Sequence, residues 1–202
     1  AAVTALTSSF CIISGGPGTG KTHTVTNILA LLLEQDMGLK ISICAPTGKA
    51  AARLQESIKK AKRGLDCSPA LLNLIPENAS TIHRLLGVRY GSPHFRHDQE
   101  NLLALDVLIV DEASMISLSL MTKLMQAASE KTRVILLGDK NQLASVEAGA
   151  VFGDICDASD INLFSNEFAS DYFSESGDMI PEEYTGGCAG SDFTVELKHS
   201  YR

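Results

Sequence analysis

A glycine-rich turn near the start of the chain has the residue types needed to hold phosphate groups. It matches the pattern GxxxxGK[ST] and consists of Gly15, Gly16, Pro17, Gly18, Thr19, Gly20, Lys21 and Thr22. Glycines let backbone N–H groups converge on an anion at a helix N-terminus, where the helix dipole adds a favourable field. Lys21 would reach the β- and γ-phosphates of a nucleotide, and the Thr22 hydroxyl would ligate Mg²⁺. The alternative is a glycine-rich turn without a ligand.

Two carboxylates follow an apolar run in the middle of the chain. Asp111 and Glu112 come directly after Val107 to Val110. If that run is a strand of the same sheet, Asp111 would lie beside Thr22 and hold Mg²⁺ through water. Glu112 would then orient or deprotonate the attacking water. Two acids in this position are also typical of an ordinary helix N-terminus.

Three further polar side chains follow apolar runs. Gln142 comes after Val134 to Leu137 and a short turn, from where its neutral amide could approach a γ-phosphate and distinguish ATP from ADP. A surface turn rich in Asp, Asn and Lys is the alternative. Ser114 and Ser117 are interpreted as helix-start residues, because no histidine is placed in the sequence to activate a serine nucleophile.

The elements that must position these groups alternate along the chain. Apolar runs predict five strands, at residues 10–13, 40–45, 107–110, 134–137 and 193–197. The periodicity of apolar residues predicts helices after the glycine turn and at residues 49–62 and 118–128. Strands alternating with helices indicate an α/β fold whose parallel sheet has helices on both faces and binds ligands at the carboxyl ends of its strands.

Length and composition exclude several classes of protein. A chain of 202 residues with 45% apolar and 20% charged residues fits a single globular domain, and not a collagenous, heptad-repeat or disordered chain. The longest apolar run, Ile28 to Leu33, is far below the roughly 20 residues of a membrane helix, and no signal-peptide layout opens the chain. We therefore expect a cytoplasmic protein without membrane contact. Five cysteines without a CxxC pair indicate reduced thiols.

The net charge of −7 is unevenly distributed. Eleven acids and no lysine or arginine lie between Asp154 and Glu196. Residues 1–153 therefore hold 24 − 11 = 13 acids and 17 − 2 = 15 bases, a net charge of +2. We expect an acidic insertion at about residues 158–192 that is solvated and mobile. Its charge should not decide whether the protein binds nucleic acid.

Six motifs in sequence order resemble those of superfamily 1 helicases, and in particular their RecD-like group. They are GGPGTGKT (15–22), APTGKAAARL (45–54), STIHRLLG (80–87), VLIVDEASMI (107–116), LLGDKNQLASVEAGAVFGDI (136–155) and SYR (200–202). The glycine motif and the acidic pair Asp111-Glu112 are shared by many NTPases. The segments APTGKAAARL, DEASMI and GDKNQLASVEAG, in this order along the chain, are specific to RecD-like chains. The resemblance implies a RecA-like P-loop NTPase domain spanning residues 1–202.

The resemblance also implies an activity and its partners. It indicates an ATP-driven motor that moves 5′ to 3′ along single-stranded DNA, with Mg²⁺ as the metal and the other two subunits of exodeoxyribonuclease V as partners in double-strand break repair and recombination. It makes Gln142 the γ-phosphate sensor and Arg202 a second γ-phosphate contact. It places Thr47, Thr81 and His83 against the DNA backbone. A helix cap is the alternative for Thr47, and packing inside a short helix is the alternative for His83.

An insertion at about residues 88–100 has bases and aromatics on both sides of a Gly-Ser-Pro turn, which predicts a small β-hairpin. In RecD-like helicases a hairpin at this place acts as a pin against the duplex fork. Arg89, Tyr90, Phe95 and Arg96 could stack on bases or contact phosphates without reading sequence. The alternative is a solvated loop.

The chain departs from the resemblance at both ends. It begins close to the first strand and stops at Arg202, where the helicases continue into a second RecA-like domain with an arginine finger. We expect an excised fragment that binds nucleotide weakly, hydrolyses it slowly and does not unwind DNA. Two other functions stay open: a stand-alone RecD-like or relaxase-type superfamily 1 helicase, and a non-catalytic nucleotide-binding module that docks a partner protein through the acidic insertion.

Overall fold

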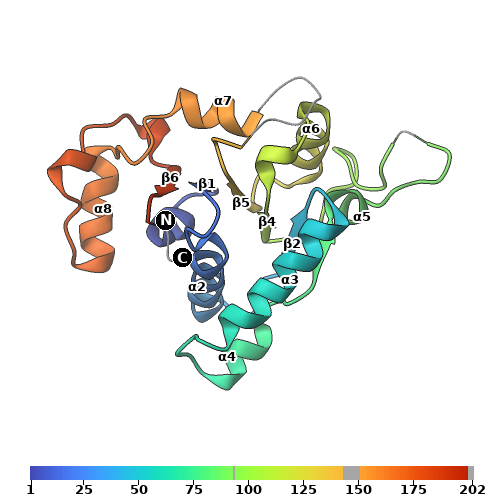
Figure 1. Ribbon diagram of the computed structural model, residues 1–202, viewed down its shortest axis with the longest axis horizontal. Coiled ribbons are helices and arrows are strands. Elements are labelled where there is room, and N and C mark those ends of the chain that lie inside the picture. Colours follow the sequence, from blue (N-terminus) through green and yellow to red (C-terminus); the bar gives the residue numbers. More distant parts are fainter. Residues whose placement is uncertain (93, 143–150, 200–202) are drawn as a thin grey trace.

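A six-stranded parallel sheet forms the centre of the computed structural model, which describes residues 1–92, 94–142 and 151–199 (Figure 1). The strand order is β3-β2-β4-β5-β1-β6, and every neighbouring pair is parallel. The strands are β1 (Phe10–Gly15), β2 (Ile41–Ala45), β3 (Ala79–Thr81), β4 (Val107–Val110), β5 (Arg133–Gly138) and β6 (Thr194–Leu197). The predicted α/β fold with a parallel sheet is confirmed.

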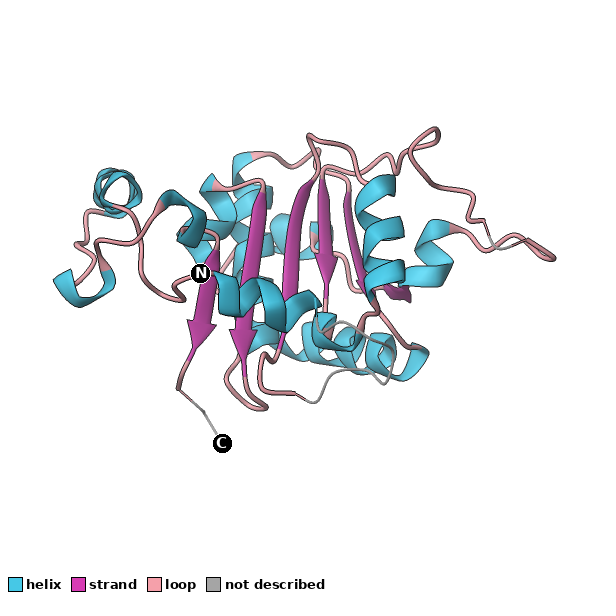
Figure 2. Cartoon of the chain, turned by 90° about the horizontal axis from the view of Figure 1, so that it is seen from above, coloured by secondary structure: helices cyan, strands magenta, loops and turns pink. Residues whose placement is uncertain are grey.

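Helices cover both faces of this sheet (Figure 2). They are α1 (Ala2–Thr7), α2 (Lys21–Gln35), α3 (Gly48–Lys62), α4 (Pro69–Leu74), α5 (Ile82–Leu86), α6 (Leu118–Ala127), α7 (Val151–Ala158) and α8 (Asn166–Ser176). Side chains of a strand point alternately to the two faces. Val107 and Ile109 accordingly pack in the core beneath α1 to α4, whereas Leu108 and Val110 pack in the core beneath α5 to α7. Both faces are buried, which explains why the central strands are uninterrupted apolar runs.

The state of the cysteines and the apolar character of the helices bear on two predictions from the sequence. All five cysteines are free, and burial raises the pKa of Cys11 and of Cys44 to about 12. That the thiols are reduced stays a prediction. Among the described residues, no helix has the length and apolar character needed to cross a membrane.

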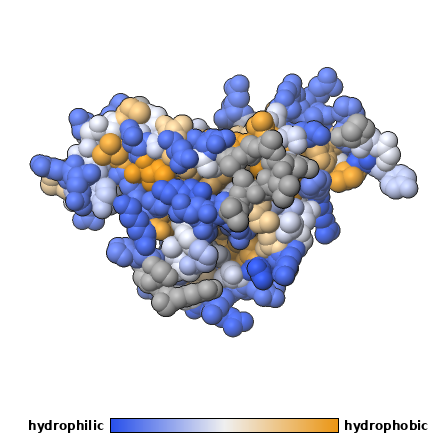
Figure 3. Space-filling model, turned by 45° about the horizontal axis from the view of Figure 1, so that its top comes forward, coloured by the Kyte–Doolittle hydropathy of each residue, from blue (hydrophilic) through white to orange (hydrophobic). Residues whose placement is uncertain are grey.

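The acidic stretch after α7 contains defined structure. The amide and hydroxyl of Ser165 donate to Asp192 at 2.6 and 2.7 Å, and Ser165 caps α8. The rings of Phe164 and Phe168 stack with their centroids 4.8 Å apart. Figure 1 shows α8 to the side of the sheet beyond β6, and Figure 3 shows hydrophilic residues over most of the face it draws, with small hydrophobic patches between them. The mobility of this stretch stays a prediction.

Parallel strands place their carboxyl ends at one edge of the sheet. The glycine turn follows β1, Thr47 follows β2, and Asp111 follows β4 at this edge. The turn that carries Gln142 follows β5, which lies between β4 and β1 in the sheet. Side chains from four separate parts of the sequence are thereby brought to the same edge.

Candidate nucleotide-binding site

The glycine turn forms a tight loop between β1 and α2. Gly18 and Gly20 have φ angles of 83° and 85°, in the left-handed region that residues with a Cβ atom rarely adopt. A Cβ atom at Gly15 would lie 2.5 Å from the Thr19 hydroxyl oxygen, which itself donates to the Gly16 carbonyl at 2.9 Å. The backbone therefore requires glycine at positions 18 and 20, and the packing against Thr19 favours glycine at position 15.

The loop leads into α2 with its first amides open to an anion. Within the described residues, α2 has no side-chain cap and no acid in its first turn, so nothing negative competes with a phosphate there. The Lys21 ammonium donates to the carbonyls of Gly15 and Gly16 at 2.5 and 3.2 Å. These bonds hold the cation over the loop, beside the place where phosphates would bind.

The acidic pair lies at the carboxyl end of β4. The Asp111 amide donates to the Cys44 carbonyl at 2.9 Å, which extends the ladder between β4 and β2. Burial raises the pKa of Asp111 to about 6, and the charge of Glu112 acts in the same direction, whereas the Glu112 amide and the Lys21 ammonium lower it. Lys21 and the acidic pair line the same cavity, which brings the ammonium within electrostatic reach of Asp111.

Glu112 has a backbone conformation that is uncommon for its residue type. Its φ is 53°, and Asn162 is the one other non-glycine residue with positive φ in the described ranges 1–92, 94–142 and 151–199. Such a conformation costs roughly 1–2 kcal/mol for a residue with a side chain. It turns the chain sharply between β4 and the 3₁₀ helix at Ala113–Met115, so that Glu112 stays at the edge of the sheet.

One cavity of about 820 Å³ brings these groups together. Its walls include Gly16 to Thr22 of the loop, Asp111, Glu112 and Gln142. The cavity is large enough for a nucleotide-sized ligand. Thr22 and Asp111 supply the hard oxygen donors that Mg²⁺ prefers, and Mg²⁺ commonly takes few protein ligands and completes its shell with water and phosphate oxygens. The absence of a cluster of three or more metal-binding side chains among the described residues is compatible with that manner of binding.

Gln142 is held in this cavity by a side chain that the sequence analysis assigned only to a helix start. The hydroxyl of Ser114, which is buried, donates to the Gln142 Oε1 atom at 2.6 Å. Ser114 thus connects the segment after β4 with the segment after β5. Ser117, in contrast, caps α6 as predicted.

The third wall of the cavity comes from α3, and the sequence analysis did not assign it. Lys49 and Arg53 line the cavity from the first turns of α3. Their spacing of four residues places both cations on one side of the helix, which is the signal that could have identified them. Thr47 lies beside them, and its hydroxyl accepts from the Ala50 amide at 3.2 Å. The helix-cap role of Thr47 is confirmed, and a contact with DNA stays a prediction.

The other residues predicted to contact DNA lie outside the lining of this cavity. Thr81 caps α5 through the Arg84 amide at 3.2 Å. His83 is exposed, so the alternative that it packs inside a short helix is wrong. Its ring packs edge to face on Phe95, with the centroids 5.8 Å apart, and the Lys123 ammonium lies 5.3 Å from the centroid of the same Phe95 ring.

The insertion after α5 contains an antiparallel bridge between Val88 and Phe95, and its loop extends away from the sheet in Figure 1. Arg89, Tyr90 and Arg96 are exposed on it. The bridge agrees with the predicted hairpin. Arg202 lies outside the described residues.

Three comparisons relate the chain to known proteins. The family described as "AAA domain" matches residues 1–148. The RecBCD enzyme subunit RecD of Haemophilus influenzae is 54% identical over 160 residues, which cover 77% of this chain and 25% of that protein. The ATP-dependent RecD2 DNA helicase of Deinococcus radiodurans is 44% identical over 138 residues, which cover 68% of this chain and 16% of that protein.

A solved structure of two coordinating Pif1 helicases at forked double-stranded DNA is 20% identical, with a TM-score of 0.46, and the match covers 95% of this chain and 40% of that chain. The chain spans about a quarter of the length of the RecD subunit that it matches.

Proposed function

The chain belongs to the AAA domain family, and from this premise we propose that residues 1–202 form the ATP-binding motor domain of a RecD-type DNA helicase that moves 5′ to 3′ on single-stranded DNA. One observation carries the proposal: the glycine loop after β1, the acidic pair after β4 and Gln142 after β5 line one cavity. The similarity to curated RecD subunits supports the RecD type. The hairpin at about 88–100 and the acidic insertion at about 158–192 are parts of this domain in the proposal.

The chemistry follows from where the side chains lie. Amides of the loop and of the first turn of α2 bind the phosphates, and Lys21 neutralises the charge that develops on them. Thr22 and Asp111 would hold Mg²⁺, which would supply charge stabilisation to the phosphate oxygens. Glu112 orients the attacking water and accepts its proton. Lys49 and Arg53 add positive charge to the wall that α3 contributes.

Gln142 is the group that reports the state of the nucleotide. It lines the cavity and is bonded to Ser114, which follows the acidic pair. A γ-phosphate that bonds to the Gln142 amide would move both segments together, because the two side chains are already connected. DNA would contact the neighbouring part of the same edge, at Thr47, Thr81, His83 and the exposed hairpin. Arg202 is the second γ-phosphate contact in this proposal.

The partners are proposed from the names of the relatives. The similarity to RecBCD subunits favours a chain that acts with the other two subunits of an exodeoxyribonuclease V in break repair. The similarity to a RecD2 helicase favours a chain that acts without them. Co-purification of the full-length protein with the products of neighbouring genes separates the two: a stable three-chain complex supports the first, and a single active chain supports the second.

Replacing Glu112 by Gln tests the catalytic role. We expect E112Q to bind ATP as the parent does, because the change keeps the shape of the side chain, and to lose roughly 10²- to 10⁴-fold in hydrolysis because the base is gone. Binding is measured by calorimetry and hydrolysis in a single turnover with excess protein. Glu130 is exposed in the turn before β5, so E130Q is the matched control.

Hydrolysis that is unchanged in E112Q would contradict the role given to Glu112. ATP binding without hydrolysis in both the parent and E112Q would instead favour the alternative of a non-catalytic nucleotide-binding module, in which ATP serves only as a ligand.

A further inference from the structure

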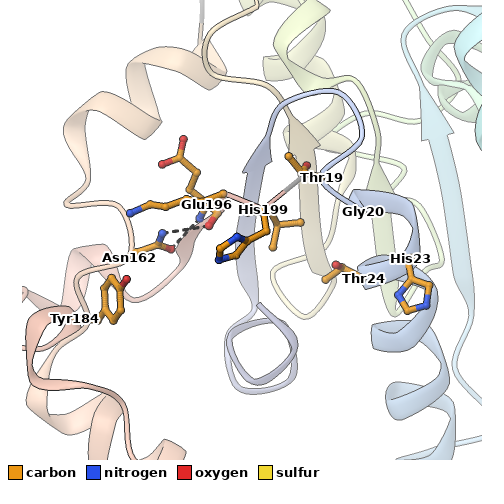
Figure 4. Close-up of a pocket in the computed structure, with 10 residues that line it drawn as sticks. Thr19, Gly20, His23, Thr24, Asn162, Tyr184, Glu196 and His199 are labelled. Atoms are coloured by element: carbon orange, nitrogen blue, oxygen red, sulfur yellow. Dashed lines mark hydrogen bonds between the residues drawn. The ribbon is translucent and has the colours of Figure 1, made fainter. Parts of the chain in front are cut away.

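A second cavity shares the glycine loop with the first. It has a volume of about 650 Å³ and is lined on one side by Thr19, Gly20 and His23, three residues that also line the first cavity. Its opposite side is formed by Tyr184, from the acidic insertion, and by the end of β6 with His199 (Figure 4). None of the roles assigned above uses this space. The segment from Thr19 to His23 therefore contributes residues to both cavities.

The two cavities differ in the groups that they offer to a ligand. The first is lined by several lysine, arginine and carboxylate side chains, whereas the second adds the rings of Tyr184 and His199 to that of the shared His23 and has Lys198 as its one lysine. The one carboxylate of the second cavity, Glu196, is paired with the Lys140 ammonium at 3.0 Å. A neutral, flat group thus meets no unpaired negative charge from the described lining of the second cavity.

The backbone holds Tyr184 in place. Its carbonyl accepts from the Phe164 amide at 2.8 Å, and its own amide donates to the Pro181 carbonyl at 2.9 Å. The Lys198 ammonium lies 5.9 Å from the centroid of the ring. The ring is half-buried. In Figure 4 it lies across the cavity from the glycine loop. These bonds hold the backbone from which the ring forms one wall of the cavity.

Asn162 fixes the position of β6 against this segment. Its side chain accepts from the Glu196 amide at 2.9 Å and donates to the Glu196 carbonyl at 3.1 Å. Both ends of the Asn162 amide are therefore engaged with the backbone of β6. A base in the cavity would be held by contact with ring faces, which are tolerant of the base that stacks on them.

We infer that the second cavity binds the base and ribose of the nucleotide whose phosphates occupy the first, with the base packed against the Tyr184 ring. The inference rests on the proposed function. Glu112 and Gln142 fix the γ-phosphate end in the first cavity, so the other end of the phosphate chain must leave past the outer turn of the loop. That turn, Thr19 to His23, opens into the second cavity. The acidic insertion thereby acquires a role, because it carries Tyr184 to the base and Asn162 to the backbone of β6.

A fluorescent reporter tests this placement directly, because the chain contains no tryptophan. In Y184W the only indole would stand in the second cavity. We expect its emission to change when Mg-ATP is titrated and to stay constant with Mg-tripolyphosphate, which has no base. Tyr172 on α8 lines a neighbouring smaller cavity and not this one, so Y172W is the matched control and should respond to neither ligand.

The inference is overturned if Y184W binds ATP by calorimetry without a change in emission, or if tripolyphosphate produces the same change.

Affinity gives a second readout that does not depend on the reporter. We expect Y184A to bind Mg-ATP roughly five-fold or more weakly, since the loss of one stacked base commonly has at least this effect, while its affinity for tripolyphosphate stays the same. Y184F keeps the ring and should bind both ligands as the parent does. ATP affinity of Y184A within two-fold of the parent would overturn the inference, and equal weakening of both ligands would do so too.

The parent chain separates this inference from the proposed function. If the parent binds neither ATP nor tripolyphosphate, the phosphate site itself is wrong and both fall. If it binds both and no Tyr184 variant changes ATP binding, only the placement of the base is wrong.

Discussion

The two cavities on either side of the glycine loop are built in different ways. The first is assembled from the segments that follow β1, β2, β4 and β5, and its lining includes six charged side chains and three loop glycines. The second takes its far wall from the acidic insertion and the end of β6. Phosphate and metal chemistry requires particular residue types in particular turns, whereas a base requires mainly a surface of suitable shape. The first kind of site can be recognised in a sequence, and the second must be found in a structure.

The largest effect on the first cavity is expected from Lys21. Replacing Lys21 by Ala removes the cation that the loop carbonyls hold beside the phosphates. We expect ATP hydrolysis to fall roughly 10²- to 10³-fold, as on loss of a positioned electrostatic donor, and both ATP and tripolyphosphate to bind more weakly. Steady-state turnover and calorimetry measure these changes. Lys131 is exposed, and K131A should behave as the parent; comparable losses in both variants would argue against a specific role.

An intermediate effect, confined to the second cavity, is expected from Asn162. N162A removes both hydrogen bonds to the backbone of Glu196. It also puts alanine, which has no polar side-chain group, at a position where φ is 61°. We expect the free energy of unfolding to fall by about 1–3 kcal/mol, measured by denaturant titration. ATP affinity should fall more than tripolyphosphate affinity. N73A, at an exposed position of α4, is the control. Equal loss of both affinities would mean that the two cavities are not separable.

The smallest effect is expected from a pair of serines near the acidic pair. S114A removes the hydroxyl that donates to Gln142, whereas S117A removes the cap of α6. Each should lower the free energy of unfolding by about 1 kcal/mol. Only S114A should also reduce the preference of the protein for ATP over ADP, because only Ser114 contacts Gln142. Competition between ATP and ADP for binding, measured on the two equally destabilised variants, checks this. An equal preference for ATP in both variants would contradict the role given to Ser114.

Most strands of the sheet were predictable from the sequence. The sheet is central in the molecule and buried on both faces, so its strands are runs of apolar residues. The run Val107 to Val110 is buried on both faces and coincides with β4, and the strand predicted from Lys40 begins one residue later, at Ile41. β3 was not predicted because its three residues, Ala79 to Thr81, are too few to show alternation. The helix α8 was missed for another reason: it has Phe168 as its one buried residue and lies within an acidic stretch.

The candidate site was predictable where a motif is continuous. The glycine loop and the acidic pair were identified from their residue types, and the structure places them on one cavity. The contacts of Ser114 with Gln142 and of His83 with Phe95 were not, because each joins segments whose distance in space is set by the fold. The second cavity has the same origin: Gly20, Asn162, Tyr184 and His199 show no common spacing in the sequence.

Asp111 offers the sharpest test of the first cavity. Replacing it by Asn should raise the stability of the fold and weaken the binding of magnesium-bound nucleotide. The pKa of Asp111 is raised to about 6, mainly by burial. A carboxyl whose pKa is raised in the folded state lowers the stability of the fold above that pKa, because its charge is then buried. Without nucleotide at pH 7.5, D111N should therefore be more stable than the parent by about 1–3 kcal/mol, as measured by denaturant titration.

The central claim is that the glycine loop and the acidic pair bind the same magnesium-bound triphosphate. The direct measurement is the affinity of the parent and of D111N for a non-hydrolysable ATP analogue, with and without Mg²⁺. The account predicts that Mg²⁺ strengthens binding to the parent and has little effect on binding to D111N, while the two proteins bind the metal-free analogue similarly. An unchanged dependence on Mg²⁺ in D111N would contradict it.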